Sequence, residues 1–311
     1  MTVTILVPIY NVEKYIAECA VSLFEQTYDD IEYVFCDDCT PDNSVAVLRD
    51  VMVDYPSRQK AVRIICMPRN SGIGKVRARL LEEVYTDAFF FVDSDDRLPP
   101  SAIEILVQRI QETDTDIVDG AHADMIGDEV MPAQLTFHGS DSTFMKRILC
   151  QNVEANRVWG RLYNTRVLKA LPDMFFDGID YSEDYCAAAR LAAVTTRAWT
   201  DEVVYIYRKD NLSSYTKNVS EKNMLSYLKA NGKVLQFYKR RDRLPLALEV
   251  GMLNTYRECR RSGIALSVAD CIVDYHPKSI ITEIIYCLLR SKTGFVVGDR
   301  LYRLLRAMVK A

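Results

Sequence analysis

Three carboxylates follow directly on a strongly apolar run. The run AFFFV at 88–92 is succeeded by Asp93, Ser94, Asp95 and Asp96. Carboxylates placed side by side repel one another and raise each other's pKa, and a divalent cation offsets that cost. Hard oxygen ligands with room for water suit Mg²⁺ or Mn²⁺, and such an ion usually bridges the phosphates of a substrate. The structural alternative is a turn in which Asp96 caps the helix expected to follow.

Two further acidic residues, Asp37 and Asp38, end the apolar stretch IEYVFC at 31–36. A carboxylate at the end of a strand can accept hydrogen bonds from a nucleobase N–H or a ribose hydroxyl. A plain turn between strand and loop explains the same residues, because the following CTPDNS is rich in turn-forming residues. From these residues alone both interpretations stay open.

A basic, glycine-containing segment, NSGIGKVRAR at 70–79, resembles a loop that binds phosphate. Lys75 and Arg77 would offset phosphate charge there; alternatively, both project into solvent from a helix. The segment is not a Walker A loop, because no Ser or Thr follows the lysine. The chain also lacks a G-x-G-x-x-G fingerprint, which argues against a dinucleotide-dependent oxidoreductase.

A third acidic site, Glu183 and Asp184, precedes the apolar helical run CAAARLAA at 186–193. Asp184 is a candidate general base that removes the proton of an acceptor hydroxyl. The structural alternative is that Ser182 caps this helix. Trp159, in the run VWGRLY at 158–163, would suit a sugar ring, although a tryptophan in an apolar run is more often part of a core.

The elements expected to position these residues alternate along the first third of the chain. Apolar β-rich runs predict strands at 3–10, 31–38, 62–67 and 88–96, and helical spacing predicts helices at 13–26, 44–55, 74–85 and 101–113. This alternation indicates a parallel sheet covered by helices on both faces. Because ligands bind beyond the carboxyl ends of such strands, we expect both acidic clusters to face one crevice.

The composition is that of a folded globular protein, with 49% hydrophobic and 26% charged residues. No apolar run reaches the length of a bilayer, and MTVTILVPIYN at the N-terminus lacks the features of a signal peptide, so we expect a cytoplasmic location. The nine scattered cysteines favour buried thiols in a reducing compartment. Cys36 and Cys39 form a C-x-x-C without a second pair at zinc-like spacing, so we expect neither zinc nor redox chemistry there.

The C-terminal third is basic. Residues 217–311 contain 18 Lys or Arg and 8 Asp or Glu, although the net charge of the chain is −4. We expect this region to face something anionic, such as the inner face of a membrane that presents a lipid-linked acceptor. The charges could equally be the solvated faces of amphipathic helices, and a homodimer formed through these helices is a further alternative.

Taken in order, these motifs resemble family 2 glycosyltransferases with the GT-A fold, a bacterial group that builds polysaccharides. The matching stretches are VPIYNVEKYIAECAVSLFEQTYDDIE, CDDCTPDNS, N-x-G with Arg77, FVDSDDRLPP, VWGRLY, Glu183-Asp184 and VVYIYRKDNLSS. The resemblance implies an α/β, Rossmann-like, mostly parallel sheet flanked by helices, with a C-terminal helical extension. We expect a catalytic domain at 1–215, with a nucleotide-binding half at 1–100 and an acceptor half at 101–215, and a basic α-helical region at 216–311.

The resemblance also implies roles for individual residues. The donor nucleotide would be contacted by Pro8, Tyr10, Asn11, Asp38, Arg77, Asp93 and Ser94. Asp95 would be the direct ligand of Mg²⁺ or Mn²⁺ in the D-x-D motif, and Asp184 the catalytic base. Trp159 and Glu183 would lie in the acceptor region, and Arg208 near the pyrophosphate. The chain departs from the family pattern at two motifs. It has D-D-C-T-P where the family usually has D-D-G-S or D-D-C-S, and it has V-R-A where A-R-N is usual.

The implied reaction is a single displacement that inverts the anomeric carbon of a nucleotide diphosphate sugar, a UDP-sugar in the first instance. The acceptor would be a glycan or lipid-linked hydroxyl, and we expect no nucleic-acid partner. One rival is a non-catalytic nucleotide-sugar or glycan-binding module of the same fold. Another is a nucleotidyltransferase, which tends to carry a basic, glycine-rich loop where this chain has YNVEKY.

Overall fold

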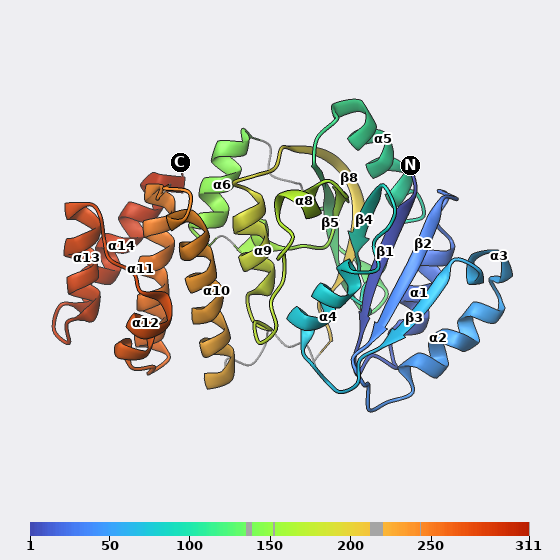
Figure 1. Ribbon diagram of the computed structural model, residues 1–311, viewed down its shortest axis with the longest axis horizontal. Helices are drawn as coiled ribbons and strands as arrows, with labels where there is room; N and C mark the ends of the chain where they lie inside the picture. The colour runs from blue at the N-terminus through green and yellow to red at the C-terminus, as the bar shows by residue number, and fades with distance from the viewer. Residues whose placement is uncertain (135–138, 152, 212–219, 243, 311) are drawn as a thin grey trace. The chain divides into compact units, whose positions relative to one another are not determined.

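The computed structural model describes residues 1–134, 139–151, 153–211, 220–242 and 244–310 (Figure 1). The chain passes back and forth between two compact units. The first unit comprises Met1–His138, Val158–Gly178 and Thr195–Lys217. The second comprises Gly139–Arg157, Ile179–Val194 and Asn218–Ala311.

The first unit is built on one mixed sheet. Its strands are β1 (Val3–Ile9), β2 (Ile31–Asp37), β3 (Val62–Cys66), β4 (Ala88–Phe91), β5 (Ile117–Ile126), β6 (Glu129–Val130), β7 (Arg161–Asn164) and β8 (Arg197–Arg208). They lie in the order β3–β2–β1–β4–β7–β5–β6, and β8 pairs with β5. Strands β1 to β4 are mutually parallel, whereas β7 runs antiparallel to β4 and β5. The predicted mostly parallel α/β sheet is therefore confirmed.

Helices cover this sheet on both faces. They are α1 (Ile16–Phe24), α2 (Ser44–Val53), α3 (Pro56–Gln59), α4 (Ile73–Leu81), α5 (Ala102–Thr113) and α8 (Val167–Ala170). Helices α1, α2 and α5 share one core cluster with β1, in which Ile16 and Leu23 of α1 and Ile5 of β1 are fully buried. Because β4 lies on the other side of β1 from β2 and β3, right-handed crossovers place α4 on the opposite face. The strand order reverses at β1, and such a reversal opens a ligand crevice at the carboxyl ends of the strands.

The second unit is helical. It contains α6 (Asp141–Leu149), α7 (Val153–Asn156), α9 (Glu183–Leu191), α10 (Glu221–Lys239), α11 (Leu246–Arg261), α12 (Leu266–Val273), α13 (Ile280–Arg290) and α14 (Phe295–Lys310). Ser140, Ser220 and Ser279 each accept a backbone N–H at the start of α6, α10 and α13, which satisfies donors that a helix leaves unpaired. Leu228 of α10 and Leu248 of α11 are fully buried. The predicted C-terminal helical extension is therefore present.

Two segments that come before residue 215 also belong to the second unit. Helix α6 packs against α11 and α14, and α9 packs against α10. The Tyr238 hydroxyl of α10 donates to the carbonyl of Ala189 in α9 at 2.9 Å. The sequence-based division put 139–157 and 179–194 in one domain with the sheet, whereas their apolar faces pack on the C-terminal helices. The predicted boundary between residues 215 and 216 lies outside the described residues.

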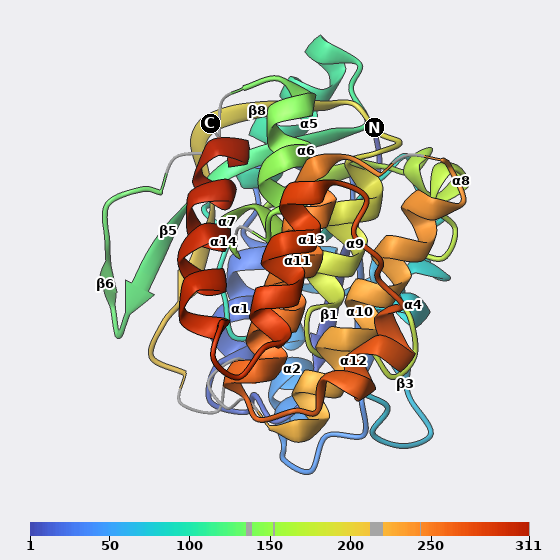
Figure 2. The ribbon, with the colours of Figure 1, turned by 90° about the vertical axis from the view of Figure 1, so that its left-hand side faces the viewer.

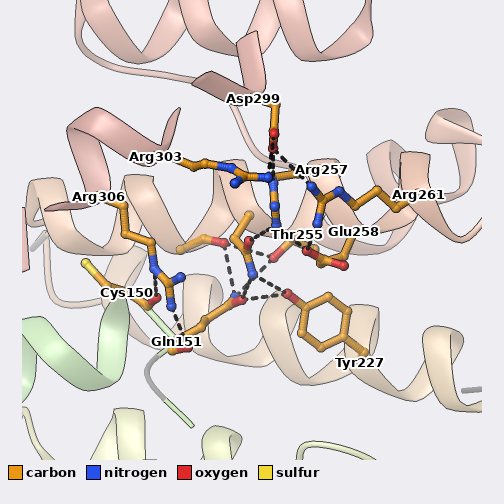
Figure 3. A network of polar contacts seen from close by, with 12 residues as sticks. Cys150, Gln151, Tyr227, Thr255, Arg257, Glu258, Arg261, Asp299, Arg303 and Arg306 are labelled. Carbon is orange, nitrogen blue, oxygen red and sulfur yellow. Dashed lines mark hydrogen bonds and ion pairs between the residues drawn. The ribbon is translucent and has the colours of Figure 1, made fainter. Parts of the chain in front are cut away.

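Ion pairs fix helix α14 against α11 within the second unit (Figure 3). Asp299 of α14 pairs with Arg257 and Arg261 of α11 and with Arg303 of its own helix. Only 14% of the Asp299 side chain is exposed, so this carboxylate is compensated by three guanidinium groups rather than by water. The pairs therefore determine which side of α14 faces inward.

Helix α14 also closes the end of α6 (Figure 3). Arg306 donates from Nε to the carbonyl of Cys150 at 3.1 Å and from a terminal nitrogen to the carbonyl of Gln151 at 3.0 Å. These carbonyls lie where a helix leaves acceptors without partners. The Gln151 side chain is bonded in turn to Asn231 and to the hydroxyl of Tyr227. A buried polar network thus joins α6, α10, α11 and α14.

Candidate active site

Three carboxylates lie together just beyond β4. Val92 continues the strand with a hydrogen bond from its N–H to the carbonyl of Leu6 at 3.0 Å. The chain then turns, and the N–H of Asp96 donates to the carbonyl of Asp93 at 3.0 Å. Asp93, Asp95 and Asp96 are close enough for their charges to affect one another. We call residues 93–96 the acidic turn.

Asp96 supports this turn from inside the protein. It is fully buried; its Oδ2 accepts from the Tyr205 hydroxyl at 2.7 Å and its Oδ1 from the N–H of Arg208 at 2.8 Å. Burial, and then repulsion from its two acidic neighbours, raises the pKa of Asp96 well above its ordinary value. The alternative that Asp96 caps the next helix is wrong, because Ser101 occupies the N-cap of α5.

Asp95 is held by groups at the end of β8. Asn211 donates from Nδ2 to Asp95 Oδ2 at 2.7 Å, and Arg208 donates from Nε to the backbone carbonyl of Asp95 at 2.9 Å. Burial is the main cause that raises the pKa of Asp95, and the charge of Asp93 raises it further. A nearby cation stabilises the ionised form of a carboxylate in this environment.

Asp93 is compensated by Arg77 of α4, with 2.8 Å between a guanidinium nitrogen and Oδ1. Arg77 is 4% exposed and lies beside the rings of Phe91 and Phe175. Ser94, the remaining residue of the turn, is also buried. The sequence assigned Arg77 to the donor phosphates, and in the structure its guanidinium is bound to the acidic turn.

Asp38, just beyond β2, holds the loop that begins α4. Its two carboxylate oxygens accept from the N–H groups of Ser71 at 2.7 Å and of Gly72 at 3.0 Å. Gly72, the N-cap of α4, has a φ of 86°, a conformation that favours glycine. Lys75, in the first turn of α4, pairs with Asp177 at 2.9 Å. Asp38 therefore positions the helix that carries Arg77.

The predicted donor loop at the end of β1 is hydrogen-bonded to the loop after β2. Pro8 lies opposite Cys36 in the register of β1 and β2. Asn11, with a φ of 55°, donates its N–H to the Thr40 hydroxyl at 2.8 Å. Tyr10 is 48% exposed. Thr40, where the chain departs from the family pattern, thus anchors the loop from which Tyr10 projects.

Arg208, predicted near a pyrophosphate, is 7% exposed and lies beneath the acidic turn. Its guanidinium pairs with Glu18 of α1 at 2.6 Å and lies 4.9 Å from the ring centre of Tyr15. Together with its bond to the Asp95 carbonyl, these contacts make Arg208 a support of the turn.

Three residues of this site escaped the sequence reasoning: Glu18, Tyr205 and Asn211. Tyr205 is 109 residues from Asp96, and Asn211 is 116 residues from Asp95. Contacts between residues so far apart in the sequence leave no local pattern from which they could be predicted. The alternation Y-I-Y at 205–207 was the available signal, because it places two tyrosines on one face of a strand.

Trp159 packs on the same face of β8. Its ring stacks on Tyr205 with centroids 4.5 Å apart and on Tyr207 with centroids 5.2 Å apart, and His122 meets its edge. The side chain is half-buried. Because Tyr205 binds Asp96, this aromatic stack also supports the acidic turn.

Glu183 and Asp184 form the first turn of α9. Asp184 Oδ1 accepts from the N–H of Tyr185 at 2.6 Å, and both acids stand where the dipole of a helix favours negative charge. Ser182 occupies the N-cap with a φ of 67° and makes no capping hydrogen bond, so the alternative that its side chain caps α9 is wrong. These acids belong to the second unit, whereas the acidic turn belongs to the first.

Cys36, the first cysteine of the C-x-x-C, is buried, whereas Cys39 is exposed. Burial is the main cause that raises the pKa of Cys36 to about 12, which makes its thiol a poor ligand and nucleophile. Within the described ranges, no group of three or more His, Cys, Asp or Glu side chains could hold a metal ion by itself.

A divalent ion at Asp95 would therefore share its coordination with substrate and water. Mg²⁺ is commonly held in this way, by one or two carboxylates together with substrate phosphates. The donor set fits, because Asp95 offers hard oxygen and its pKa is raised by burial and by Asp93. The residues of the acidic turn are thus suited to Mg²⁺ or Mn²⁺ shared with a diphosphate.

A parallel half-sheet that reverses at β1, with carboxylates beyond β4, defines an α/β protein of the doubly wound class. Residues 4–171 match the family described as glycosyl transferase family 2. The chain belongs to this family, as the motifs in the sequence predicted.

Curated relatives agree with this assignment. The chain is 28% identical over 226 residues to the uncharacterized glycosyltransferase EpsJ of Bacillus subtilis, covering 69% of this chain and 63% of EpsJ. It is 32% identical over 118 residues to glycosyltransferase GlyG of Streptococcus pneumoniae, covering 38% of each. A processive diacylglycerol beta-glycosyltransferase of Mycoplasma pneumoniae is 26% identical over 243 residues, covering 73% of this chain and 69% of that protein. The chain thus spans less than two thirds of EpsJ and of GlyG.

Solved structures share the fold. S. aureus TarS 1–349 in complex with UDP-GlcNAc superposes with a TM-score of 0.65 at 18% identity, covering 98% of this chain and 92% of that one. The mannosyltransferase PcManGT from Pyrobaculum calidifontis, in complex with GDP-Man and Mn²⁺, has a TM-score of 0.57 at 14% identity, covering 99% and 86%. The predicted GT-A fold is therefore confirmed.

Proposed function

We propose that the chain transfers a sugar from a nucleotide diphosphate sugar, first of all a UDP-sugar, to an acceptor hydroxyl. The observation that carries the proposal is the acidic turn, which lies where the strand order reverses and contains Asp95 with a pKa raised by burial. A diphosphate that brings a divalent ion is a ligand suited to such a site. Family membership supports the activity, and the UDP-GlcNAc of TarS and the GDP-Man and Mn²⁺ of PcManGT support the class of donor and the ion.

The donor side of the site is formed by the first unit. Asp95 would hold the Mg²⁺ or Mn²⁺ ion, and a bound ion would supply positive charge against the leaving diphosphate. Asp38 and the loop Pro8–Asn11 face the base and ribose, with Asp93 and Ser94 beside them. Arg77 and Arg208 keep the acidic turn in place through their bonds to Asp93 and to the Asp95 carbonyl.

The transfer is a single displacement that inverts the anomeric carbon. Asp184 takes the proton of the acceptor hydroxyl as that oxygen forms its bond to the anomeric carbon from the face opposite the diphosphate. The bond between the anomeric carbon and the diphosphate oxygen breaks, and its electron pair leaves with the diphosphate. Glu183 and Trp159 belong to the acceptor side.

The acceptor is a growing polysaccharide or a glycolipid. Its support is the Mycoplasma pneumoniae relative, a processive diacylglycerol beta-glycosyltransferase, together with the family itself. Cytoplasmic synthesis on the inner face of a membrane is consistent with both kinds of acceptor.

A panel of UDP-, GDP- and dTDP-sugars, each with and without Mn²⁺, tests the donor by thermal shift. The right donor raises the unfolding temperature in the presence of the ion, because bound ligand stabilises the folded chain. NMR of the product formed with that donor then gives the anomeric configuration, and retention would contradict the mechanism. A chain that binds the donor with Mn²⁺ but neither hydrolyses nor transfers it would be the binding module instead.

A further inference from the structure

The outer side of helices α13 and α14 carries a row of exposed apolar side chains. They are Ile280, Ile281 and Ile284 from α13, and Val296, Val297, Leu301, Leu304 and Met308 from α14. We call these eight residues the hairpin face. The two helices lie side by side in front of α11 (Figure 2), and a Cβ on Gly298 would come within 2.9 Å of α13. A single exposed leucine is ordinary, but an apolar set of this extent marks a binding surface.

The hairpin face is not a packing surface of the second unit. Val297, Leu301, Leu304 and Met308 repeat at helical spacing along one side of α14, where Leu304 is 63% and Met308 75% exposed. Another side of the same helix carries Asp299 and Arg306, which are bonded to α11 and α6 (Figure 3). Because these polar contacts fix the inward side, folding of this unit does not require the outer side to be apolar.

Basic side chains surround the hairpin face. Lys278 precedes α13, Lys292 lies between the two helices, and Arg300 and Arg303 stand beside Leu301 and Leu304 on α14. All four are exposed. The acid of α14, Asp299, faces inward and is paired with three arginines. One exposed acid, Glu283 of α13, lies beside Ile284, so the charge along the edge of the apolar row is positive on balance.

We propose that the hairpin face docks on an anionic lipid bilayer, with α13 and α14 lying in the plane of the interface. Apolar side chains on one side of a helix with basic residues at its edge fit the boundary between acyl chains and anionic headgroups. In the part of the chain that the structure describes, no helix is long and apolar enough to cross a membrane, so the contact is peripheral. A two-fold dimer through the same face would bring the four cations of each copy into one interface. This inference goes beyond the proposed function and does not depend on it.

The test is flotation of the full chain with vesicles of phosphatidylcholine alone and of phosphatidylcholine mixed with phosphatidylglycerol. Wild type binds the mixed vesicles more tightly, and salt weakens that binding. The double variant Leu304→Ser, Met308→Ser loses at least about tenfold in the partition coefficient for the mixed vesicles. The triple variant Lys278→Gln, Lys292→Gln, Arg300→Gln loses about fivefold per charge on mixed vesicles and changes little on neutral ones.

Two matched control variants carry the same kinds of substitution at exposed positions outside the hairpin face. Val53→Ser with Tyr85→Ser removes two exposed apolar side chains of the first unit, and Arg49→Gln, Lys60→Gln, Lys229→Gln removes three exposed charges. Both controls bind as wild type does, and all four variants unfold at the wild-type temperature. Equal losses in controls and test variants would overturn the proposal, as would a wild type that does not float. A wild-type dimer that Leu304→Ser, Met308→Ser converts to a monomer, with vesicle binding unchanged, would assign the face to a second copy instead.

Discussion

The side chain of Asn211 donates a hydrogen bond to the carboxylate of Asp95, with 2.7 Å between Nδ2 and Oδ2. Asn211 follows directly on the segment that supplies Tyr205 and Arg208 to Asp96. One short stretch of chain therefore positions two of the three acids in the turn. Asp95 faces the proposed ion, and Asn211 determines how that carboxylate is oriented.

Replacing Asn211 should weaken the binding of the ion without removing it. Loss of a group that orients a metal ligand commonly costs 10–100-fold in metal affinity. We expect Asn211→Ala to raise the Mn²⁺ concentration that gives half of the UDP-dependent thermal shift by about tenfold. Asn211→Asp should recover part of that affinity, because an added carboxylate increases the attraction for a divalent ion. If Asn211→Ala needs the same Mn²⁺ concentration as wild type, Asn211 has no positioning role.

Asp95→Asn should abolish the part of nucleotide binding that depends on the ion. An amide keeps the shape of the side chain and can still accept from Asn211, but it no longer supplies an anionic ligand. Isothermal titration with UDP, in Mn²⁺ and then in EDTA, measures the two contributions. Asp50→Asn, an exposed position on α2, is the control and should keep the dependence on the ion. An Asp95→Asn protein that still needs Mn²⁺ for UDP would place the ion elsewhere.

Asp184→Asn should stop transfer and leave the donor bound. A general base contributes about 10²–10⁴-fold to a rate, so the rate should fall by that factor while the thermal shift with donor and Mn²⁺ stays as in wild type. Glu221→Gln, which removes an exposed acid from the first turn of α10, is the matched control for a lost charge and should keep the activity. Normal turnover by Asp184→Asn would remove Asp184 from the mechanism.

The pair of Asp270 in α12 with Arg290 in α13 should make the second unit sensitive to acid. Hydrogen bonds from Arg290, the largest cause, lower the pKa of Asp270 below its ordinary value, and their lengths are 2.6 and 2.8 Å. A carboxyl whose pKa is lowered on folding stabilises the protein above its unfolded pKa of about 3.9. That stability is lost as the pH falls through the folded pKa.

Asp270→Asn should therefore lower the free energy of unfolding at pH 7 by about 0.5–1 kcal/mol, a value typical of an exposed pair. The difference from wild type should stay constant down to about pH 5, shrink as the pH falls through the unfolded pKa of about 3.9, and vanish below the folded pKa. Urea unfolding at several pH values measures it. A difference that persists at the lowest pH would mean that packing, rather than charge, is lost.

Gly251→Ala should destabilise the second unit although alanine favours helices. A Cβ at this position of α11 would come within 2.1 Å of the carbonyl oxygen of Leu149 in α6, so one of the two helices must move. We expect the clash to lower the free energy of unfolding by about 1–3 kcal/mol. This loss is larger than the gain of about 1 kcal/mol that alanine brings through its higher helix propensity. Gly263→Ala has open space around its Cβ but a φ of 74° and should cost less. Equal stability of Gly251→Ala and wild type would show that α6 and α11 do not pack as closely as described.

The parallel half of the fold was predictable because its signals are local. The runs around Ile5, Phe35 and Phe90 are apolar and β-rich, the intervening helices repeat every three or four residues, and acids mark two of the strand ends. Alternation of such elements leaves few arrangements of the sheet. Hence the sequence alone predicts that Asp38 and the acidic turn lie at one edge of the sheet.

The rest of the fold depends on pairings between strands that are far apart in the sequence, and no local pattern predicts them. Strand β7, which carries Arg161, inserts antiparallel between β4 and β5, and β8 pairs with β5 only after an intervening segment of the second unit. The supporting roles of Tyr205 and Arg208, and the packing of α6 and α9 on the C-terminal helices, follow from those pairings. Arg208 was singled out by its position after a strand, but its burial against Glu18 could not be read from that position.

Because Asp96 takes both of its partners from β8, the order of synthesis matters. A ribosome that has delivered α5 has released strands β1 to β4, yet Tyr205 and Arg208 are 109 and 112 residues beyond Asp96. Closing so long a loop is slow compared with pairing neighbouring strands. Until β8 joins the sheet, the Asp96 carboxylate is hydrogen-bonded to water. The acidic turn is thus among the last parts of the first unit to reach its final arrangement, and a message cut short before β8 would yield a sheet without its last strand and an Asp96 without its two partners.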